Sequence, residues 1–228
     1  MPERLLEKPW VPRVLPFGVY MAFIALEPYI TQLAPASMSA VMPALVYAAK
    51  TMCVIAALLA FRKSYDELKG FHPNMSGCLL SVAAGAVVFA LWINMDWDFA
   101  VMGGQKVFDP ASIPDGYRNL FFAVRIFGAA IVVPVFEELF WRSLILRYII
   151  NPDFLSVRIG AYTLASFAIS SVLFGLEHYL WLAGIMAGAA YNLLLYRTGN
   201  IWYPVMAHGV TNFMLGVYVL ASGQWRFW

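Results

Sequence analysis

The chain has 228 residues, of which 62% are hydrophobic and only 12% are charged, and its formal net charge is +2. A soluble domain typically carries about 25% charged residues, so this composition excludes an ordinary soluble protein and indicates an integral membrane protein. The small net charge, without a basic tail, gives no support for a nucleic-acid partner. Cys53 and Cys78 lie in apolar runs; we expect them to be small packing residues, not a disulfide or a metal pair.

A helix that crosses a bilayer needs about 20 mostly apolar residues. On that criterion the sequence predicts an all-α, polytopic transmembrane helical bundle with about seven spans, or eight as the alternative. We expect one integral membrane domain over residues 1–228, with a retained first span. In chain order the predicted spans cover residues 14–33, 40–61, 75–95, 119–141 (119–150 in a longer version), 159–177, 180–196 and 201–221.

Basic residues gather in alternate connections, which predicts the orientation of the chain. They precede the first span and recur after the second, fourth and sixth spans. Because basic loops stay on the cytoplasmic side, we expect a cytoplasmic N-terminus and an external C-terminus. The longest connection, residues 96–118, is rich in glycine and proline; an ordinary loop is the simpler interpretation, and a cover over a cavity is the alternative.

The fourth predicted span contains two adjacent carboxylates, Glu137 and Glu138, followed by Arg142. Ionisable side chains at membrane depth are costly and usually functional. Glu138 and Arg142 have the spacing and order that favour a helical ion pair, whereas Glu137 is turned by about 100° around the helix. We therefore expect Arg142 to neutralise Glu138 and to leave Glu137 available. The alternative is that both acids only hold helices together.

Two histidines occur on later spans. His178 follows Phe174 at the end of the fifth predicted span, and His208 precedes Asn212 in the middle of the last one. Residues four apart share a helix face, so His208 and Asn212 should project together. A lone histidine is more often a hydrogen-bonded packing residue, but two histidines, an asparagine and a carboxylate pair in one small bundle favour a site.

Other charges in the spans have simpler interpretations. Glu27 and Lys50 lie at similar depths if the first two helices are antiparallel, which predicts a structural ion pair. Glu177 is at a span end, where it can reach the interface, and Arg125 is near enough to a helix end to snorkel.

The polar groups indicate hydrolysis by water, because no serine or cysteine lies in an evident nucleophile motif. Glu137 can remove a proton from water with help from His178, while His208 and Asn212 can donate hydrogen bonds to an oxyanion. A zinc site made of His178, His208 and a glutamate is the nearest rival. The helical H-E-x-x-H pattern of such proteases is missing, so the zinc rival is weaker.

Three short motifs occur in order on the predicted spans: E-E-x-x-x-R at Glu137, Glu138 and Arg142, F-x-x-x-H at Phe174 and His178, and H-x-x-x-N at His208 and Asn212. In order and approximate spacing they resemble the motifs of the CPBP family, the CAAX proteases and bacteriocin-processing enzymes. The resemblance implies a glutamate-dependent intramembrane endopeptidase. In that enzyme Glu137 activates water with His178, His208 and Asn212 form the oxyanion hole, and Glu138 and Arg142 organise the site.

The resemblance covers an expected catalytic core of about residues 119–221. The sequence around residues 141–143 and 191–197 also resembles the bacterial CAAX prenyl protease-related branch associated with exosortase and PEP-CTERM sorting systems. These resemblances imply a bacterial inner (plasma) membrane location, contact with membrane lipid, and a protein or peptide substrate that is lipid-modified or membrane-anchored. No cofactor and no metal are expected.

Two other functions stay open: a proton-coupled transporter, because Glu and His chains also carry protons, and a non-enzymatic scaffold or immunity factor. The predicted spans also conflict on one point. They place Glu137 at mid-depth and His178 at an outer end, yet groups that share one water must lie within a few ångströms. Either the fourth helix is long and tilted and runs to Ile150, or the turn after His178 enters the protein.

Overall fold

The computed structural model describes residues 7–35, 37–39, 41–103 and 109–228. Helices are the regular elements of this described part, which confirms the predicted all-α fold. α4, α5 and α6 belong to one continuous helix over residues 115–150, in which two π-helical segments, Gly128–Val132 and Leu139–Ile145, join them. The α-helices are α1 (Val11–Gln32), α2 (Met42–Ala60), α3 (Met75–Trp92), α4 (Asp115–Phe127), α5 (Val133–Glu138), α6 (Leu146–Ile150), α7 (Leu164–Leu176), α8 (Trp181–Thr198) and α9 (Trp202–Ser222).

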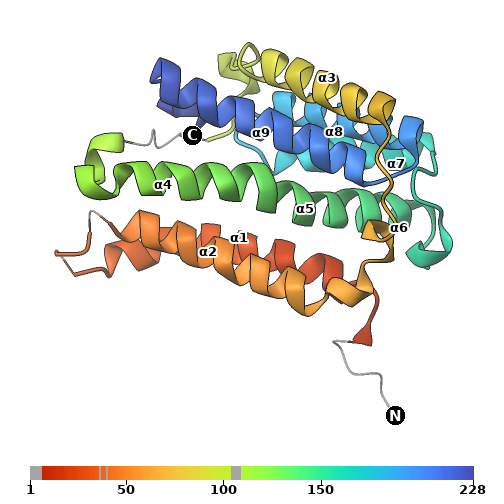
Figure 1. Cartoon of the computed structure of the whole chain (residues 1–228), viewed down its shortest axis with the longest axis horizontal. Helices are drawn as coiled ribbons and strands as arrows, with labels where there is room; N and C mark the ends of the chain where they lie inside the picture. Colours follow the sequence, from red (N-terminus) through yellow and green to blue (C-terminus); the bar gives the residue numbers. More distant parts are fainter. Residues whose placement is uncertain (1–6, 36, 40, 104–108) are drawn as a thin grey trace.

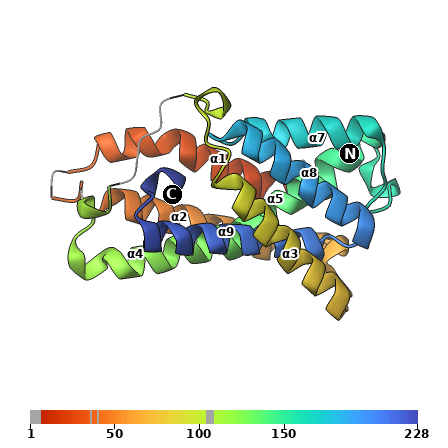
Figure 2. The same ribbon diagram turned by 90° about the horizontal axis from the view of Figure 1, so that it is seen from above.

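The long α4–α6 helix lies between two groups of helices. On one side is the antiparallel pair α1–α2, and on the other are α3, α7, α8 and α9 (Figure 1). Viewed from above, α3 crosses α8 and α9, while α7 and α8 run side by side (Figure 2). The long helix therefore contacts both groups, and residues on its opposite faces can be buried at once.

Local sequence signals set several helix ends. The side chain of Asn74 accepts a hydrogen bond from a backbone N–H in the first turn of α3, and Thr163 and Ser166 form a reciprocal capping box at the start of α7. Gly199 and Gly223 adopt φ values of +64° and +69° directly after α8 and α9, a conformation that glycine adopts without strain. α3 begins at Met75 as predicted, whereas α7 begins at Leu164, five residues after the predicted start of its span.

Each predicted span corresponds to a helix, but the helices differ in length. Five are long and apolar enough to cross a membrane: α1, α2, α3, the 115–150 helix and α9. The fourth helix takes the longer predicted version, which ends at Ile150. α7 has 13 residues and is about 20 Å long, which is less than the roughly 30 Å hydrocarbon core of a bilayer.

The short α7 and its partner α8 form a tight hairpin whose turn is covered by the 93–103 connection. A Cβ on Gly184 would lie 2.8 Å from the Cα of Gly175, so glycine permits the close approach of the two helices. The backbone N–H of Met102 donates to Tyr179 O at 2.9 Å, and Trp181 Nε1 donates to Phe99 O at 3.3 Å. This part of the long connection thus covers the α7–α8 turn.

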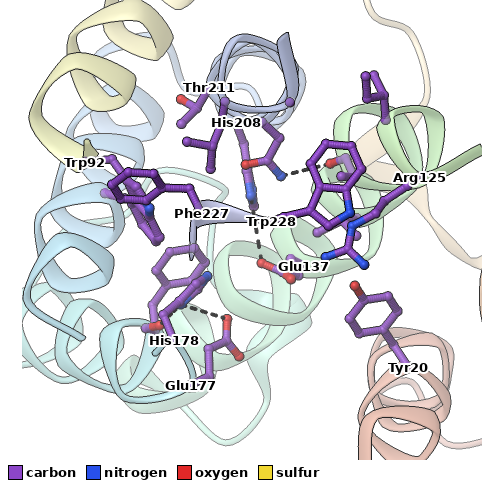
Figure 3. A pocket seen from close by; sticks show the side chains of 18 of the residues that line it. Tyr20, Trp92, Arg125, Glu137, Glu177, His178, His208, Thr211, Phe227 and Trp228 are labelled. Atoms are coloured by element: carbon purple, nitrogen blue, oxygen red, sulfur yellow. Dashed lines mark hydrogen bonds and ion pairs between the residues drawn. The ribbon is translucent and has the colours of Figure 1, made fainter. Parts of the chain in front are cut away.

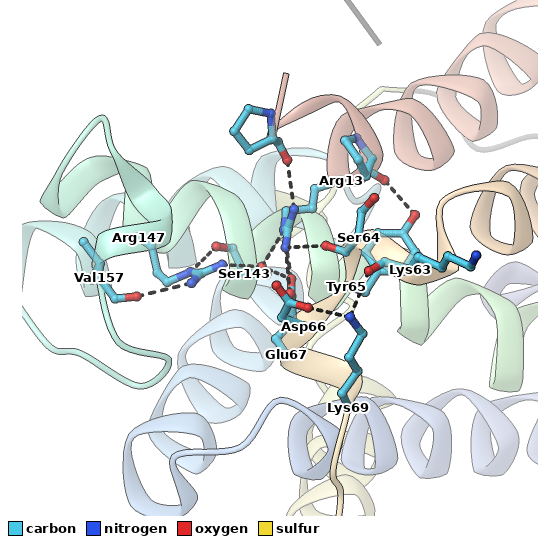
Figure 4. A network of polar contacts seen from close by, with 12 residues as sticks. Arg13, Lys63, Ser64, Tyr65, Asp66, Glu67, Lys69, Ser143, Arg147 and Val157 are labelled. Atoms are coloured by element: carbon cyan, nitrogen blue, oxygen red, sulfur yellow. Dashed lines mark hydrogen bonds and ion pairs between the residues drawn. The ribbon is translucent and has the colours of Figure 1, made fainter. Parts of the chain in front are cut away.

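A buried polar network ties the start of α1 to the α2–α3 connection and to the long helix (Figure 4). Arg13 donates from Nε and Nη2 to the two carboxylate oxygens of Glu67, at 2.8 and 2.6 Å, and from Nε to Ser143 Oγ at 2.9 Å. Ser143 donates to Glu67 and accepts from Arg147 Nη2 at 2.7 Å. Burial alone would raise the pKa of Glu67, but the hydrogen bonds and charge of Arg13 and the hydrogen bond from Ser143 outweigh it and hold that pKa below 4.5.

We expect Glu67→Gln to lower the stability at neutral pH by about 3 kcal/mol, because it leaves the buried guanidinium of Arg13 without its counter-ion. The pKa of Glu67 is lower in the folded than in the unfolded state. The difference in unfolding free energy between wild type and Glu67→Gln is therefore fully present above the unfolded pKa. It is lost as the pH falls through the folded pKa. Thermal unfolding of both proteins in detergent, at neutral pH and at a series of acidic pH values, measures how the difference in stability decreases.

Asp66→Asn is the matched control. Asp66 is next to Glu67 in sequence, but its side chain is 85% exposed and pairs with the exposed Lys69, and such surface pairs contribute about 0–1 kcal/mol. An equal loss in both variants, or a loss in Glu67→Gln that does not change with pH, would contradict the assigned role of the buried carboxylate.

Candidate active site

Glu138 and Arg142 form the ion pair expected from their spacing, deep inside the bundle. Arg142 Nη1 donates to Glu138 Oε1 at 3.1 Å, and Arg142 Nε lies 3.1 Å from Glu138 Oε2. The two side chains are 0% and 1% exposed. Buried charges are tolerated only when they are paired and hydrogen-bonded, so this contact fixes where the long helix can sit.

Arg142 also binds the α7–α8 hairpin. Its Nε donates to Asn192 Oδ1 at 3.1 Å, and its Nη2 donates to the backbone oxygen of Gly188 at 3.0 Å. Asn192 in turn donates from Nδ2 to Ser170 Oγ at 2.9 Å and to Ser171 Oγ at 3.0 Å. One guanidinium therefore links the long helix to α8 directly and to α7 through an asparagine.

His208, on α9, lies between the two glutamates. Its Nδ1 is 3.0 Å from Glu138 Oε1, and its Nε2 is 3.9 Å from Glu137 Oε2. The ring of Tyr191 stacks on the imidazole with centroids 5.1 Å apart, and the Tyr191 hydroxyl donates to Thr211 Oγ1 at 2.8 Å. The carboxylate of Glu138 and the stacked ring thus fix the orientation of His208.

Asn212 is one turn further along α9 and contacts the first π-helical segment of the long helix. Its Nδ2 donates to the backbone oxygen of Ala129 at 2.8 Å. Between His208 and Asn212, a Cβ on Gly209 would lie 2.7 Å from the backbone oxygen of Ala130, so only glycine permits this approach of α9. An amide NH₂ has two hydrogens, and the contact to Ala129 uses one of them.

His178 lies in the turn between α7 and α8. Its Nδ1 is 2.7 Å from the backbone oxygen of Phe174. A carbonyl oxygen can only accept, so Nδ1 carries the proton and Nε2 is the acceptor of the neutral ring. The imidazole packs against the rings of Trp92 and Phe174, with centroid distances of 5.4 and 4.8 Å.

Glu177 belongs to the site, although the sequence analysis placed it toward the interface. Its side chain is mostly buried, contacts the long helix and lines the cavity, which the sequence did not predict. Trp141 Nε1 donates to Glu177 Oε1 at 3.0 Å, and the side chain is 12% exposed. Carboxylate oxygens of Glu137 and Glu177 and a ring nitrogen of His178 lie within 4.8 Å of one another. The position of Glu177 next to His178 was the sequence signal that could have identified it.

The conflict over depth is resolved by two features. The fourth helix runs on to Ile150, so Glu137 is well inside it, and the turn that carries His178 is covered by residues 97–102. A carboxylate oxygen of Glu137 and a ring nitrogen of His178 lie within 4.8 Å of each other, so the two side chains meet.

A single cavity of about 370 Å³ brings the predicted residues together. Glu137, Glu177, His178, His208 and Asn212 line it (Figure 3). Glu137 is 7% exposed, and its Oε2 accepts no hydrogen bond from the described residues. A buried carboxylate oxygen thus faces the cavity, while Glu138 and Arg142 do not line it and hold the surrounding helices.

The far part of the same cavity is cationic and aromatic. Arg125 lines it together with Tyr20, Tyr47 and Trp228, and its guanidinium carbon is 5.3 Å from the Tyr47 ring centroid and 5.0 Å from that of Trp228 (Figure 3). The sequence did not predict that Arg125 lines this cavity, and its reach to the interface stays a prediction. Lys50, expected to pair with Glu27, has its Nζ 4.2 Å from the Tyr20 ring centroid.

The first π-helical segment explains how Arg125 and Glu137 share one cavity. In a regular α-helix, 12 residues amount to three turns plus about 120°, so the two side chains would diverge. A π turn contains about one residue more than an α turn, so it reduces the rotation between the two side chains around the helix axis by about 100°. Consequently Arg125, Ala129, Val133 and Glu137 all line the cavity.

The fold and the site define a polytopic helical membrane protein with two carboxylates, two histidines and an asparagine around one buried cavity. Residues 119–214 match the Rce1-like family, described as type II CAAX prenyl endopeptidase Rce1-like. This match confirms the resemblance over residues 119–214, a segment that contains all six predicted site residues. The chain has no significant match among curated proteins or solved structures. The narrower exosortase-associated resemblance stays a prediction.

We expect Asn192→Ala to destabilise the protein by about 2 kcal/mol. It removes the acceptor of Arg142 and the donor to Ser170 and Ser171, and buried polar groups left without partners cost about 1–3 kcal/mol. Thermal unfolding in detergent measures the effect.

Asn94→Ala is the matched control for this substitution. Asn94 is exposed and donates only to the backbone of its own helix among the described contacts, at Ala90 O, so its replacement should change the melting temperature little. Equal melting temperatures for Asn192→Ala and wild type would contradict the assigned role of Asn192.

Proposed function

We propose that this CAAX-type membrane endopeptidase hydrolyses a peptide bond with a water activated by Glu137. The observation that supports this most directly is the shared cavity, in which a carboxylate oxygen of Glu137 lies within 4.8 Å of a ring nitrogen of His178, and Glu137 Oε2 lies 3.9 Å from His208 Nε2. A water held between Glu137 and His178 would face a substrate carbonyl in the same cavity.

In the proposed reaction, the water oxygen bonds to the carbonyl carbon and its proton passes to Glu137. His208 and Asn212 donate hydrogen bonds to the resulting oxyanion. Donation from His208 Nε2 requires the doubly protonated ring, whose Nδ1 proton is shared with Glu138. When the C–N bond breaks, Glu137 returns the proton to the leaving amine, and the carboxylate is restored.

Each side chain has a distinct role in this scheme. Glu137 is the general base and acid, and His178 orients the water through Nε2. Glu138 and Arg142 touch no reacting atom; they position His208 and the helices around it. Most of the cavity lining is apolar, which strengthens each hydrogen bond to developing charge.

We expect Glu137→Gln to lower kcat by about 10²–10⁴-fold, the usual contribution of a general base, with a smaller effect of His178→Ala. The assay uses purified protein in liposomes and fluorogenic peptides ending in a CAAX sequence, with and without a prenyl group, because the family description names a prenyl endopeptidase.

Glu27→Gln is the matched control, because Glu27 is also in a predicted span but does not line the cavity. It should retain wild-type kcat. Undiminished cleavage by Glu137→Gln would exclude the proposed base, and the absence of any cleavage would favour the transporter or scaffold alternatives.

A zinc-dependent protease is the second candidate, and one observation favours it. The ligand atoms of Glu137, Glu177 and His178 are close enough to share one metal ion, and three protein ligands are typical of catalytic zinc. His208, which the sequence analysis included among the zinc ligands, is outside this group.

The metal-free mechanism predicts less than about 0.1 zinc per chain after purification and unchanged cleavage in a chelator. Elemental analysis and a chelator series measure both. Stoichiometric zinc whose removal abolishes activity, and loss of that zinc in Glu177→Gln, would replace the first mechanism with the second.

We further propose a bacterial inner (plasma) membrane location with a cytoplasmic N-terminus, and a peptide or protein substrate that is lipid-modified or membrane-anchored. The five long apolar helices support a membrane location, and the basic connections support the orientation; the bacterial inner membrane rests on the family resemblance alone. Entry of the substrate through lipid is compatible with a cavity that lies among the predicted spans.

A further inference from the structure

The cavity of the proposed reaction is filled in part by the chain itself. After α9 the backbone turns at Gly223, whose φ is +69°. Residues 224–228, the tail segment, then fold back into the region between α9 and α4 (Figure 1). Phe227 and Trp228 line the same cavity as the predicted catalytic residues (Figure 3). Two large aromatic side chains thus take up space at the site, and the proposed reaction gives neither of them a role.

Aromatic contacts with α4 and α9 hold the tail segment against the bundle. The ring of Trp225 stacks on that of Phe122 with centroids 5.6 Å apart, and the ring of Trp228 lies 5.5 Å from the same phenylalanine. Phe227 lies 6.1 Å from Tyr218 of α9. The three aromatic side chains of the segment are only half-buried, and aromatic pairs are individually weak. The tail segment is therefore held in place without being an inseparable part of the core.

An ion pair joins the tail segment to the connection that follows α3. Arg226 Nη1 lies 2.8 Å from Asp96 Oδ2, and the two side chains are 49% and 24% exposed. The same connection covers the α7–α8 turn, which carries His178. One stretch of backbone thus contacts the tail segment and the turn at the site, and its exposed ion pair is weak enough to open and close.

The size of the cavity indicates that a substrate needs the space of these side chains. About 370 Å³ is near the lower end of the roughly 300–1,000 Å³ of pockets for drug-sized ligands, and a peptide of several residues is larger. Most lining residues belong to α-helices, whereas Phe227 and Trp228 lie beyond the end of α9. Moving these two side chains enlarges the cavity and disturbs no α-helix.

We propose that the tail segment is an autoinhibitory element, held closed by the Asp96–Arg226 ion pair, which a peptide substrate has to displace before it binds. This inference rests on the proposed function, since it takes the cavity as the place of the substrate. Only the open fraction of the protein binds, so closure raises the apparent Kd in proportion. The segment regulates binding and takes no part in the chemical step.

Reversing the charges of the ion pair tests the proposal in the full-length chain. Asp96→Arg and Arg226→Asp each place like charges opposite one another, and the double variant restores the pair in the reverse order. In nanodiscs and in the Glu137→Gln background, fluorescence anisotropy gives the Kd of a fluorescein-labelled, prenylated CAAX peptide. Hydrogen exchange of the tail-segment amides, followed by mass spectrometry without peptide, reports closure directly.

Each single charge reversal should lower the Kd by about 2–5-fold, the range for the loss of one exposed ion pair, and should speed up exchange in the tail segment. The double variant should return both values to those of the unreversed protein. Trp228→Ala should also lower the Kd, because it empties part of the cavity. A higher Kd in Trp228→Ala would instead make this residue a wall of the substrate site and would overturn the proposal.

Asp98→Arg is the matched control, because Asp98 is in the same connection but is exposed and does not line the cavity. It should leave the Kd and the exchange rates unchanged. Melting temperatures verify that each variant is folded. Equal Kd values with and without the ion pair, failure of the double variant to restore them, or no binding of the peptide to any variant would overturn the proposal.

Cleavage of the same peptide, measured with Glu137 restored, separates this proposal from the proposed function. A lower KM with unchanged kcat in the single charge reversals supports the autoinhibitory role. If cleavage fails in every protein while the differences in Kd and exchange hold, the proposed reaction falls and the autoinhibitory segment stands. If cleavage depends on Glu137 but KM is the same in all charge variants, the reaction stands and the segment has no such role.

Discussion

The structure depends on how one buried cation is neutralised. Arg142 is in the middle of a helix bundle, where an unpaired charge would cost several kcal/mol. Its donors are distributed over Glu138 on its own helix, a side chain of α8 and a backbone oxygen of α8. Satisfying this guanidinium therefore fixes the long helix against the α7–α8 hairpin, and the cavity forms beside that contact.

The same interaction divides the two adjacent glutamates. The carboxylate of Glu138 is paired with Arg142 and His208, whereas Glu137 presents an oxygen to the cavity. The Arg13–Glu67 network, which contacts the long helix at Ser143, is a useful contrast. It is equally buried and equally well paired, but its residues do not line the cavity, so its role is to join helices.

The irregular backbone of the long helix adds a second constraint. A π-helical segment realigns residues that a regular helix would turn apart, so that Arg125 and Glu137 line one cavity. In this segment the backbone oxygen of Ala129 accepts a hydrogen bond from Asn212, and Gly209 packs closely against the backbone oxygen of Ala130. One local departure from α-helical geometry thus serves the shape of the cavity and the placement of α9.

The membrane class, the helices and the Glu138–Arg142 pair could be predicted from the amino-acid sequence, because composition, apolar run length and i, i+4 spacing are local properties. Glu137, His178, His208 and Asn212 could also be identified as polar residues in apolar surroundings. The positions of Glu177 and Arg125 at the cavity, and the contact of Asn192 with Arg142, became evident from the folded structure. These facts depend on where the short α7 ends in space and on a π turn within the long helix, and neither is encoded in residue spacing along a regular helix.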